Sequence, residues 1–424
     1  MPVDQWGGQA VFTVIVGLAS VGLLIFPLDL RWRSLVAASV VALLWFEAPT
    51  VGNHMLIAAL ISAVALIARP WSPGWFRRAA PGMRAVSLIS YSFAAFAKLN
   101  SGFFDPLESC ARHFANQTLG FYQLPEIPAR SPGAWLVIVA SAAVELSVPM
   151  MLLIRPLRRI GVLVAMTFHL VLALDRLQHF YDFTLVLLPL FLLFTPPGTL
   201  TRFVGKLGGP TDPSAGRWVV PLVAMVFAFA LPAPPAFKGM AVIGSWILWV
   251  MLLVQIVRAL VSTRWSSPSL SWRGLIPMAP ILALALLNGL APYLELKTAT
   301  GYNMYSNLVT SGGETNHFLV PATGGLREEG GDLVVIVETD DEDLAEYVDS
   351  GFAIPFVNLT DYLADHPETS LAYERNGERF VIDRAGDHPE LTEGLPYLVE
   401  KLAFFRAVPV GETAECQNGW LPAR

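Results

Sequence analysis

The chain has 424 residues, of which 54% are hydrophobic and 15% are charged, and its formal net charge is −6. A soluble domain carries about 25% charged residues, so this composition indicates a membrane protein. The negative charge gives no reason to expect a nucleic-acid partner. The two cysteines lie far apart and form no CxxC, which excludes a cysteine metal cluster or a thioredoxin-type motif, and no metal site is expected.

Apolar segments recur over the first two thirds of the chain. A helix needs roughly 20 apolar residues to cross a bilayer, so the shorter segments would have to be tilted, re-entrant or buried in a bundle. The candidates are Val11–Leu28, Ser34–Glu47, His54–Ala68, Arg84–Leu99, Gly133–Ile154, Ile160–Leu174, Phe183–Thr195, Trp218–Leu231, Met240–Val257 and Leu275–Pro292. We expect an all-α polytopic membrane bundle of about 8–10 transmembrane helices over residues 1–292. The first residues lack a basic region, so no cleavable signal peptide is expected.

Basic residues between these segments predict the orientation of the bundle. When alternate loops are grouped, one set contains fifteen lysines and arginines, with Arg84 among them, and the other set contains four. Cytoplasmic loops carry the excess of basic residues in membrane proteins. The asymmetry predicts a multi-pass protein of the plasma membrane whose two termini both lie outside the cytoplasm.

The polar last third of the chain is expected to form a small extracytoplasmic α+β domain over residues 331–424, after a polar segment at the membrane mouth over residues 293–330. "DLVVIVET" predicts a buried strand, and "DEDLAEYVDS" and "NLTDYLADHP" predict helices. "LAYERNGERFVIDR" alternates around Asn376-Gly377, which is a strong hairpin signal. "LPYLVEKLAFFR" predicts a closing amphipathic helix.

The predicted topology places both cysteines outside the cytoplasm. Cys110 lies in the long outer loop after the fourth segment, and Cys416 lies in the outer tail. Disulfides persist in such oxidising compartments, where exposed free thiols are disfavoured. We therefore expect a bridge between the loop and the tail; the alternative is two unpaired thiols.

Three ionisable residues fall within the apolar segments: Lys98, Glu145 and His169. Such groups are costly in a bilayer and usually face a cavity or a partner. At helical spacing Lys98 shares a small, polar face with Tyr91, although a lysine near a helix end can also snorkel to the headgroups. Glu145 stands one turn before Pro149, and its expected partner is an arginine or a backbone group freed by the proline.

His169 lies about a turn and a half from the outer end of its segment, and Asp175 and His179 follow at the expected outer surface. All seven histidines fall in the outer half of the predicted topology, which suggests a polar site that opens outward. A hydrogen-bonded packing role is the alternative for His169. The stretch from Leu296 to Pro321 is rich in polar residues and glycine, which is typical of a lid, a substrate contact or a plain connector. Its candidate site residues are Asn303, Tyr305, Asn307 and His317.

Three stretches resemble one family: "YSFAAFAKLNSGFF", "VELSVPMMLLIRPLRRIGVLVAMTFHLVLAL" and "FTLVLLPLFLLF". They are similar to the membrane core of the vitamin K-dependent gamma-carboxylase-like proteins, which include the bacterial horizontally transferred transmembrane (HTTM) domain proteins. The resemblance covers residues 84–195 well and the flanking segments loosely. It implies an enzyme that oxidises a reduced naphthoquinone, the hydroquinone of vitamin K or menaquinone, to an epoxide with oxygen.

By the same resemblance Lys98 is the base that deprotonates the hydroquinone, and His169 hydrogen-bonds a quinone oxygen or relays a proton. A base must be neutral, and burial favours a neutral lysine. Tyr91, Glu145, His179 and the four residues of the mouth segment are the expected cofactor contacts. The coupled reaction adds carbon dioxide to a glutamate of a protein or peptide on the outer face. The family's extramembrane disulfide has a placement analogous to a bridge between the two cysteines.

The chain also departs from the family. Its tail is much shorter than a carboxylase's lumenal portion, and no propeptide-binding site or glutamate-presenting groove is recognisable. Two other functions therefore stay open: a quinone-dependent membrane oxidoreductase without carboxylation, and a non-enzymatic membrane binding or assembly protein in which Lys98 snorkels. A transporter is a weaker fourth interpretation, because no internal repeat is present.

Overall fold

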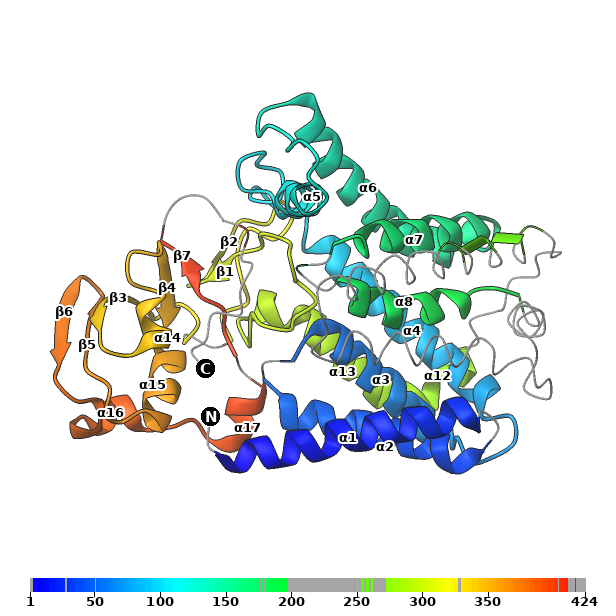
Figure 1. The fold of residues 1–424 in the computed structure, drawn as a ribbon, viewed down its shortest axis with the longest axis horizontal. Helices are drawn as coiled ribbons and strands as arrows, with labels where there is room; N and C mark the ends of the chain where they lie inside the picture. The colour runs from blue at the N-terminus through cyan, green and yellow to red at the C-terminus, as the bar shows by residue number, and fades with distance from the viewer. Residues whose placement is uncertain are drawn as a thin grey trace.

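The computed structural model describes residues 3–196, except 27, 28, 50, 176, 178 and 179, and residues 272–410, except 327, 328 and 403. It also describes Cys416 and a few residues between 250 and 261. The described helices are α1 (Val3–Ile25), α2 (Leu30–Glu47), α3 (Asn53–Ile67), α4 (Trp75–Phe96), α5 (Cys110–Phe121), α6 (Pro132–Leu153), α7 (Arg158–Leu172), α8 (Phe180–Leu192), α12 (Trp272–Leu275), α13 (Ala279–Leu290), α14 (Glu342–Ala345), α15 (Phe356–Asp365), α16 (Pro389–Thr392) and α17 (Tyr397–Leu402). The long helices lie together, and a small sheet stands beside one end of them (Figure 1). The predicted segments Trp218–Leu231 and Met240–Val257 lie mostly outside the described residues.

Two stretches among the described residues are long and apolar enough to cross a membrane: Pro132–Leu153 and Arg273–Leu294. Three shorter apolar helices accompany them, at Thr13–Leu23, Asn53–Ile67 and Phe183–Leu192. The described part of the chain is thus mainly helical and contains two helices of spanning length. These two helices are fewer than the 8–10 crossings that the sequence predicts.

The core of the helical part lies between α3, α4, α7, α8 and α13. Val64 on α3, Val86 on α4, Val162 on α7 and Phe194 after α8 have no exposed side-chain surface in this cluster. α6 begins with a favourable cap, because the Ser131 hydroxyl accepts a hydrogen bond from Ala134 N and proline occupies the first turn. α4 packs against α3, α6 and α13. These neighbours determine which face of α4 is buried and where its C-terminal end lies.

α4 differs from the predicted fourth segment at both of its ends. It begins at Trp75, nine residues before the expected start, and ends at Phe96, so that Lys98 lies just beyond the helix. Arg84, which we placed in a basic loop, is 9% exposed inside the helix and donates from Nε to the Leu193 carbonyl at 2.7 Å. The carbonyl is near the free C-terminal end of α8, where a cation is electrostatically favoured. This contact explains why an arginine continues α4.

The sheet part has five antiparallel strands in the order β6-β5-β3-β4-β7. The strands are β3 (Leu333–Thr339), β4 (Phe352–Pro355), β5 (Leu371–Arg375), β6 (Glu378–Ile382) and β7 (Val408–Pro409). β3 matches the predicted buried strand. β5 and β6 form the predicted hairpin, in which Asn376 and Gly377 both adopt a positive φ, as a two-residue type I′ turn requires. Leu359 and Leu363 of α15 are fully buried in the core of this sheet.

Two helices of this region are shorter than predicted. α14 ends at Ala345, since Tyr347 leaves the helical course and buries its ring in the sheet core. α17 ends at Leu402, and Phe404 contacts the helical part, where its carbonyl accepts from the backbone N–H groups of Thr298 and Ala299. In both places tertiary packing overrides the helical pattern in the sequence.

A segment with an unusual backbone, residues 295–307, joins the helical part to the sheet, and it is called the constrained segment below. Five non-glycine residues within it have φ between 51° and 59°: Glu295, Thr300, Tyr302, Tyr305 and Asn307. A positive φ is uncommon outside glycine, and for a β-branched threonine it is strained. Glu295 is 2% exposed and accepts hydrogen bonds from Gly313 N and the Thr323 hydroxyl, each at 2.7 Å. Such contacts hold the backbone in conformations that it would otherwise leave.

We expect Lys297 to make the stability of this segment depend on pH. Burial lowers the pKa of Lys297 to about 8, against 10.5 for an unburied lysine. Below the folded pKa both states carry the proton and the folded state bears the cost of the buried ammonium. Between the two pKa values only the unfolded chain binds the proton, so stability rises with pH in that window. Lys297→Met should therefore raise the melting temperature more at about pH 7 than at about pH 10. Thermal unfolding in detergent measures this, and an equal gain at both pH values would contradict it.

Candidate functional site

A cavity of about 520 Å³ lies between α3, α4, α5, α6, α7 and α8, and residues of the constrained segment close one side of it. Most of its wall is apolar, with aromatic rings from Phe114, Phe168, Phe180 and Phe183. Its volume is in the range of small-molecule sites, which are lined mainly by apolar and aromatic side chains with a few placed polar groups. The polar groups in this wall include Lys98, Glu145 and His169, the three ionisable residues that the sequence analysis singled out.

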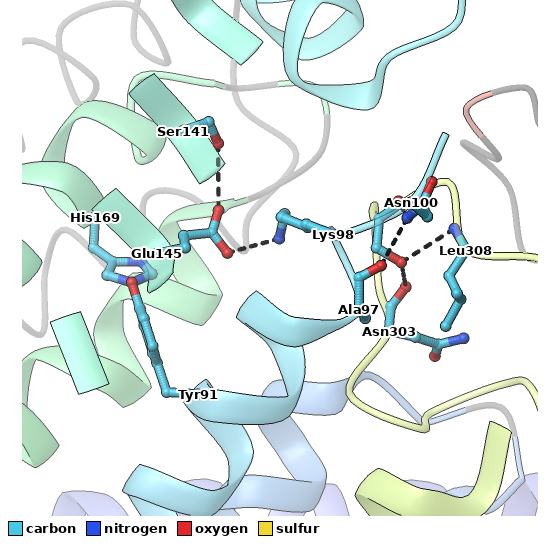
Figure 2. A network of polar contacts seen from close by, with 10 residues as sticks. Tyr91, Ala97, Lys98, Asn100, Ser141, Glu145, His169, Asn303 and Leu308 are labelled. Carbon is cyan, nitrogen blue, oxygen red and sulfur yellow. Dashed lines mark hydrogen bonds and ion pairs between the residues drawn. The ribbon is translucent and has the colours of Figure 1, made fainter. Parts of the chain in front are cut away.

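Lys98 and Glu145 form a buried ion pair in the cavity wall. Lys98 Nζ donates to Glu145 Oε2 at 2.7 Å, and the two residues are each 8% exposed (Figure 2). The Ser141 hydroxyl, one turn before Glu145 on α6, donates to the other carboxylate oxygen at 3.4 Å. The partner of Glu145 is therefore Lys98, and neither an arginine nor a backbone group as we expected. The pair also excludes the snorkelling interpretation of Lys98 in this structure, because the amine points to a carboxylate inside the protein.

The turn after α4 places Lys98 at the cavity. Lys98 N and Leu99 N donate to the carbonyls of Ala95 and Phe96, which tightens the helix end into a short turn. Asn100 is fully buried and holds this turn to the constrained segment: its Nδ2 donates to Ala97 O at 2.7 Å and to Ser306 O at 2.6 Å. Figure 2 shows this network on the side of Lys98 away from Glu145.

Replacing Asn100 with alanine is expected to loosen the turn that carries Lys98. The Asn100 side chain donates to the carbonyls of Ala97 and Ser306 and accepts from the Phe103 amide. The change to alanine removes all three hydrogen bonds. Each buried unsatisfied group costs about 1–3 kcal/mol. Asn100→Ala should lower the free energy of unfolding by several kcal/mol on that basis, whereas Asn316→Ala, at a half-buried neighbour, should cost less. Thermal unfolding of the two variants in one detergent measures the difference, and equal melting temperatures would contradict the assignment.

His169 and Tyr91 form a second polar group in the wall. His169 Nε2 lies 3.2 Å from the Tyr91 hydroxyl, and the side chains are 2% and 7% exposed. The His169 carbonyl accepts from the Thr184 hydroxyl at 2.9 Å, which fixes α7 against α8. His169 Nδ1 is buried and has no hydrogen-bond partner among the residues that the structure describes. Since buried polar atoms are nearly always paired, this unpaired nitrogen is an exception in the wall of the cavity.

The residues predicted in the mouth segment divide between the cavity and the scaffold. Tyr305 lines the cavity between Phe114 and Phe180, with ring centroids 4.7 Å and 5.2 Å away, and burial raises its pKa so that the phenol stays protonated. Asn303 and Asn307 lie outside the cavity wall. Asn307 accepts from Cys110 N at 2.9 Å and donates to Glu108 O, so its role is to fasten the outer loop.

His317 is also a scaffold residue. Its Nδ1 accepts from Leu319 N at 3.1 Å, which leaves Nε2 as the donor to the Phe96 carbonyl at 2.9 Å. Both ring nitrogens are therefore engaged in holding the mouth segment to the end of α4. His179, the remaining predicted contact, lies outside the described residues.

Several cavity residues were missed or misplaced by the sequence analysis. Asp175, which we placed at the outer surface, is 1% exposed, lines the cavity and accepts from the Thr118 hydroxyl at 3.1 Å. Asn53 at the start of α3 accepts from Tyr302 N, while its Nδ2 has no partner among the described residues. Ser141 precedes Glu145 by four residues, and this helical spacing was the one available signal for it.

The predicted disulfide between Cys110 and Cys416 is present, with a Cα–Cα distance of 4.9 Å. Cys110 is the first residue of α5, the helix that contributes Phe114, Ala115 and Thr118 to the cavity wall. The Thr118–Asp175 contact and the hydrogen bond from the Tyr122 hydroxyl to Leu174 O hold the other end of α5 to the end of α7. α5 is thus fixed at both ends over the cavity.

The arrangement suits proton transfer from a ligand in an apolar enclosure. Moving one proton along the 2.7 Å contact from Lys98 to Glu145 leaves a neutral amine beside a neutral acid, which can accept a proton from a hydroxyl group. Among the described residues no cluster of three or more histidine, cysteine or acidic side chains could hold a metal ion. Comparison with protein-family models, with curated proteins and with solved structures finds no match to this chain, so its function is inferred from the site.

Proposed function

We propose that the chain is a multi-pass membrane enzyme of the vitamin K-dependent gamma-carboxylase-like kind, which oxidises a naphthohydroquinone with Lys98 as the base. The observation that carries the proposal is the Lys98–Glu145 ion pair in the wall of a mainly apolar cavity. A buried ion pair costs desolvation energy and is weak evidence for stability, so a role in chemistry is a better reason for its presence. The motif that suggested the family contains both Lys98 and Tyr91, and both line this cavity.

The membrane arrangement is part of the proposal. The helical part spans the bilayer with about 8–10 segments, and the sheet part and both termini lie outside the cytoplasm, in keeping with the distribution of basic residues. Two described helices of spanning length and the exposed apolar side chains on α6 support it, among them Leu136 at 70% and Val139 at 49%. On this arrangement the cavity lies in the outer half of the bilayer, where a lipophilic quinone is dissolved.

The cavity residues fit a reduced naphthoquinone. The flat ring system suits a wall of phenylalanine and tyrosine rings, and His169 and Asn53 are polar residues of the same wall, each with one side-chain nitrogen that has no partner among the described residues. When bound, the hydroquinone supplies two electrons for the reduction of oxygen and a strong base for carboxylation. Lys98 accepts the hydroxyl proton after passing its own to Glu145, and Tyr91 holds the His169 ring in place through their hydrogen bond.

Turnover of a hydroquinone by the purified protein tests the proposal. The protein is reconstituted in lipid nanodiscs and supplied with reduced menaquinone and oxygen, and epoxide formation is followed by chromatography. Radioactive carbon dioxide and a glutamate-containing peptide are added in a second set of reactions. Epoxide with labelled peptide supports the full carboxylase reaction. Epoxide without label supports the alternative, a quinone-dependent oxidoreductase that does not carboxylate.

The proposal would be overturned if the chain proved to be a non-enzymatic binding protein. That alternative makes its own prediction. It predicts saturable quinone binding without any epoxide, under conditions in which an authentic epoxidase is active. Ala140→Trp serves as a control for the site, because Ala140 lines the cavity from the exposed side of α6 and a bulky ring there should block binding. Turnover that is unchanged in this variant would place the reaction elsewhere.

A further inference from the structure

An exposed aromatic pair joins the end of α2 to α17. The Trp45 indole N–H donates to the Tyr397 hydroxyl at 3.0 Å, with ring centroids 6.1 Å apart. Trp45 is 41% exposed and Tyr397 is 55% exposed. Tryptophan and tyrosine gather at the two boundaries between membrane and water, where one end of the ring is in contact with apolar chains and the other with water. The pair links a long helix of the helical part to the sheet part at one point.

The orientation of α17 is the reverse of that of a helix on a soluble protein. Lys401 is 6% exposed and its Nζ donates to the Ala48 carbonyl at 2.8 Å. Leu398 and Leu402, in contrast, are 59% and 58% exposed. A surface helix in water buries its leucines and exposes its lysine. Here the lysine fastens the helix to the end of α2, and the leucines are left on the outside.

A similar group of residues lies on the other side of the helical part. It is formed by the end of α5 and the start of α6, and its exposed members are Phe121, Tyr122, Leu124 and Trp135. Both groups are at the end of the helical part that is next to the sheets (Figure 1). Exposed tryptophan and tyrosine near one end of a helical bundle are typical of a boundary between membrane and water.

We infer that α17 lies in the outer boundary of the bilayer and holds the sheet part against the membrane through its exposed leucines. The inference rests on the proposed membrane arrangement and adds a lipid-binding role for the sheet part. Its partner is the phospholipid at the level where headgroups meet acyl chains. Lys401, the one basic residue of α17, is buried on the Ala48 carbonyl, so α17 presents no basic side chain to anionic lipid and binding depends on apolar contact.

Site-specific fluorescence measures the environment of α17. The two native cysteines are joined in the disulfide, so a single introduced cysteine is the one thiol for an environment-sensitive dye. The test position is Leu398→Cys. The matched control is Val381→Cys on β6, which is 69% exposed in the same part of the chain, and the membrane control is Val139→Cys on α6. Each protein is placed in phosphatidylcholine nanodiscs with one copy per disc, which prevents a second copy from covering the dye.

The dye at position 398 should be quenched by nitroxide lipids labelled near the headgroup and protected from aqueous iodide. The dye at 381 should show the reverse, and replacing half of the lipid with phosphatidylglycerol should change neither. Iodide quenching at 398 equal to that at 381 would overturn the inference. If the dye at 139 is still quenched by lipid in that case, the membrane arrangement stands and the role of α17 alone is wrong. If the dye at 139 is quenched by iodide, the membrane arrangement itself fails.

Discussion

Replacing Lys98 with methionine is expected to lower hydroquinone turnover by about 10²–10⁴-fold, the range for the loss of a positioned general base. Lys98 is in the cavity wall and is the one lysine there, among the described residues. Methionine keeps the length and apolar stem of the side chain but cannot accept a proton. Binding of the quinone should persist, since the aromatic wall is unchanged. Initial rates of epoxide formation in nanodiscs, with binding measured on the same samples, separate the two effects.

The Lys98 variant needs a control for folding, because the change leaves Glu145 buried without its partner. Breaking a buried pair in this way costs about 3–5 kcal/mol. The double variant Lys98→Met with Glu145→Gln removes both charges and should recover most of that stability while remaining inactive. Lys401→Met changes another buried lysine, which binds Ala48 O away from the cavity, and should keep the wild-type rate. Wild-type turnover in a folded Lys98→Met protein would exclude Lys98 as the base.

Removing the disulfide is expected to weaken both the fold and the binding of a quinone. Cys110→Ser with Cys416→Ser should lower the free energy of unfolding by about 2–4 kcal/mol. The bridge joins residues 306 positions apart, so it restricts the unfolded chain over most of its length. It also fixes the first residue of α5, so we expect quinone affinity to fall together with stability. Thermal unfolding and quinone binding measure the two consequences.

The matched control for the disulfide is chemical reduction. A reductant should lower the melting temperature of the wild-type protein to that of the double serine variant and should leave the variant unchanged. Labelling with a thiol reagent before and after reduction confirms that the bridge was intact at the start. A double serine variant that unfolds at the wild-type temperature would show that the bridge contributes nothing to the fold.

Local signals predicted some elements well. The Asn376-Gly377 hairpin was predicted because a two-residue turn determines the pairing of its own strands. The buried strand β3 was predicted from a short apolar run. α14 and α17 were predicted to be longer than they are, because Tyr347 and Phe404 form contacts with distant segments and the helical pattern alone does not show them.

The sequence singled out three ionisable residues of the cavity wall but not their contacts, and it did not single out Asn53 or Ser141. The cost of an ionisable group among apolar residues was enough to single out Lys98, Glu145 and His169. Their pairing depends on how α4, α6 and α7 cross. The spacing of residues along the chain does not predict this crossing, since Lys98 and Glu145 are 47 positions apart. Composition was a poor guide in the mouth segment, where Asn307 and His317 use their polar groups to hold the backbone.

Photo-crosslinking of a quinone to the protein tests the central claim most directly. A naphthoquinone that carries a diazirine is added to the protein in nanodiscs and activated by light, and the labelled peptides are identified by mass spectrometry. Our account predicts labels on cavity residues of α4, α6 and α7, such as Ala94, Val144 and Phe168, and their loss when unlabelled menaquinone is in excess. Labels confined to surfaces outside the cavity, or labels that menaquinone does not displace, would contradict it.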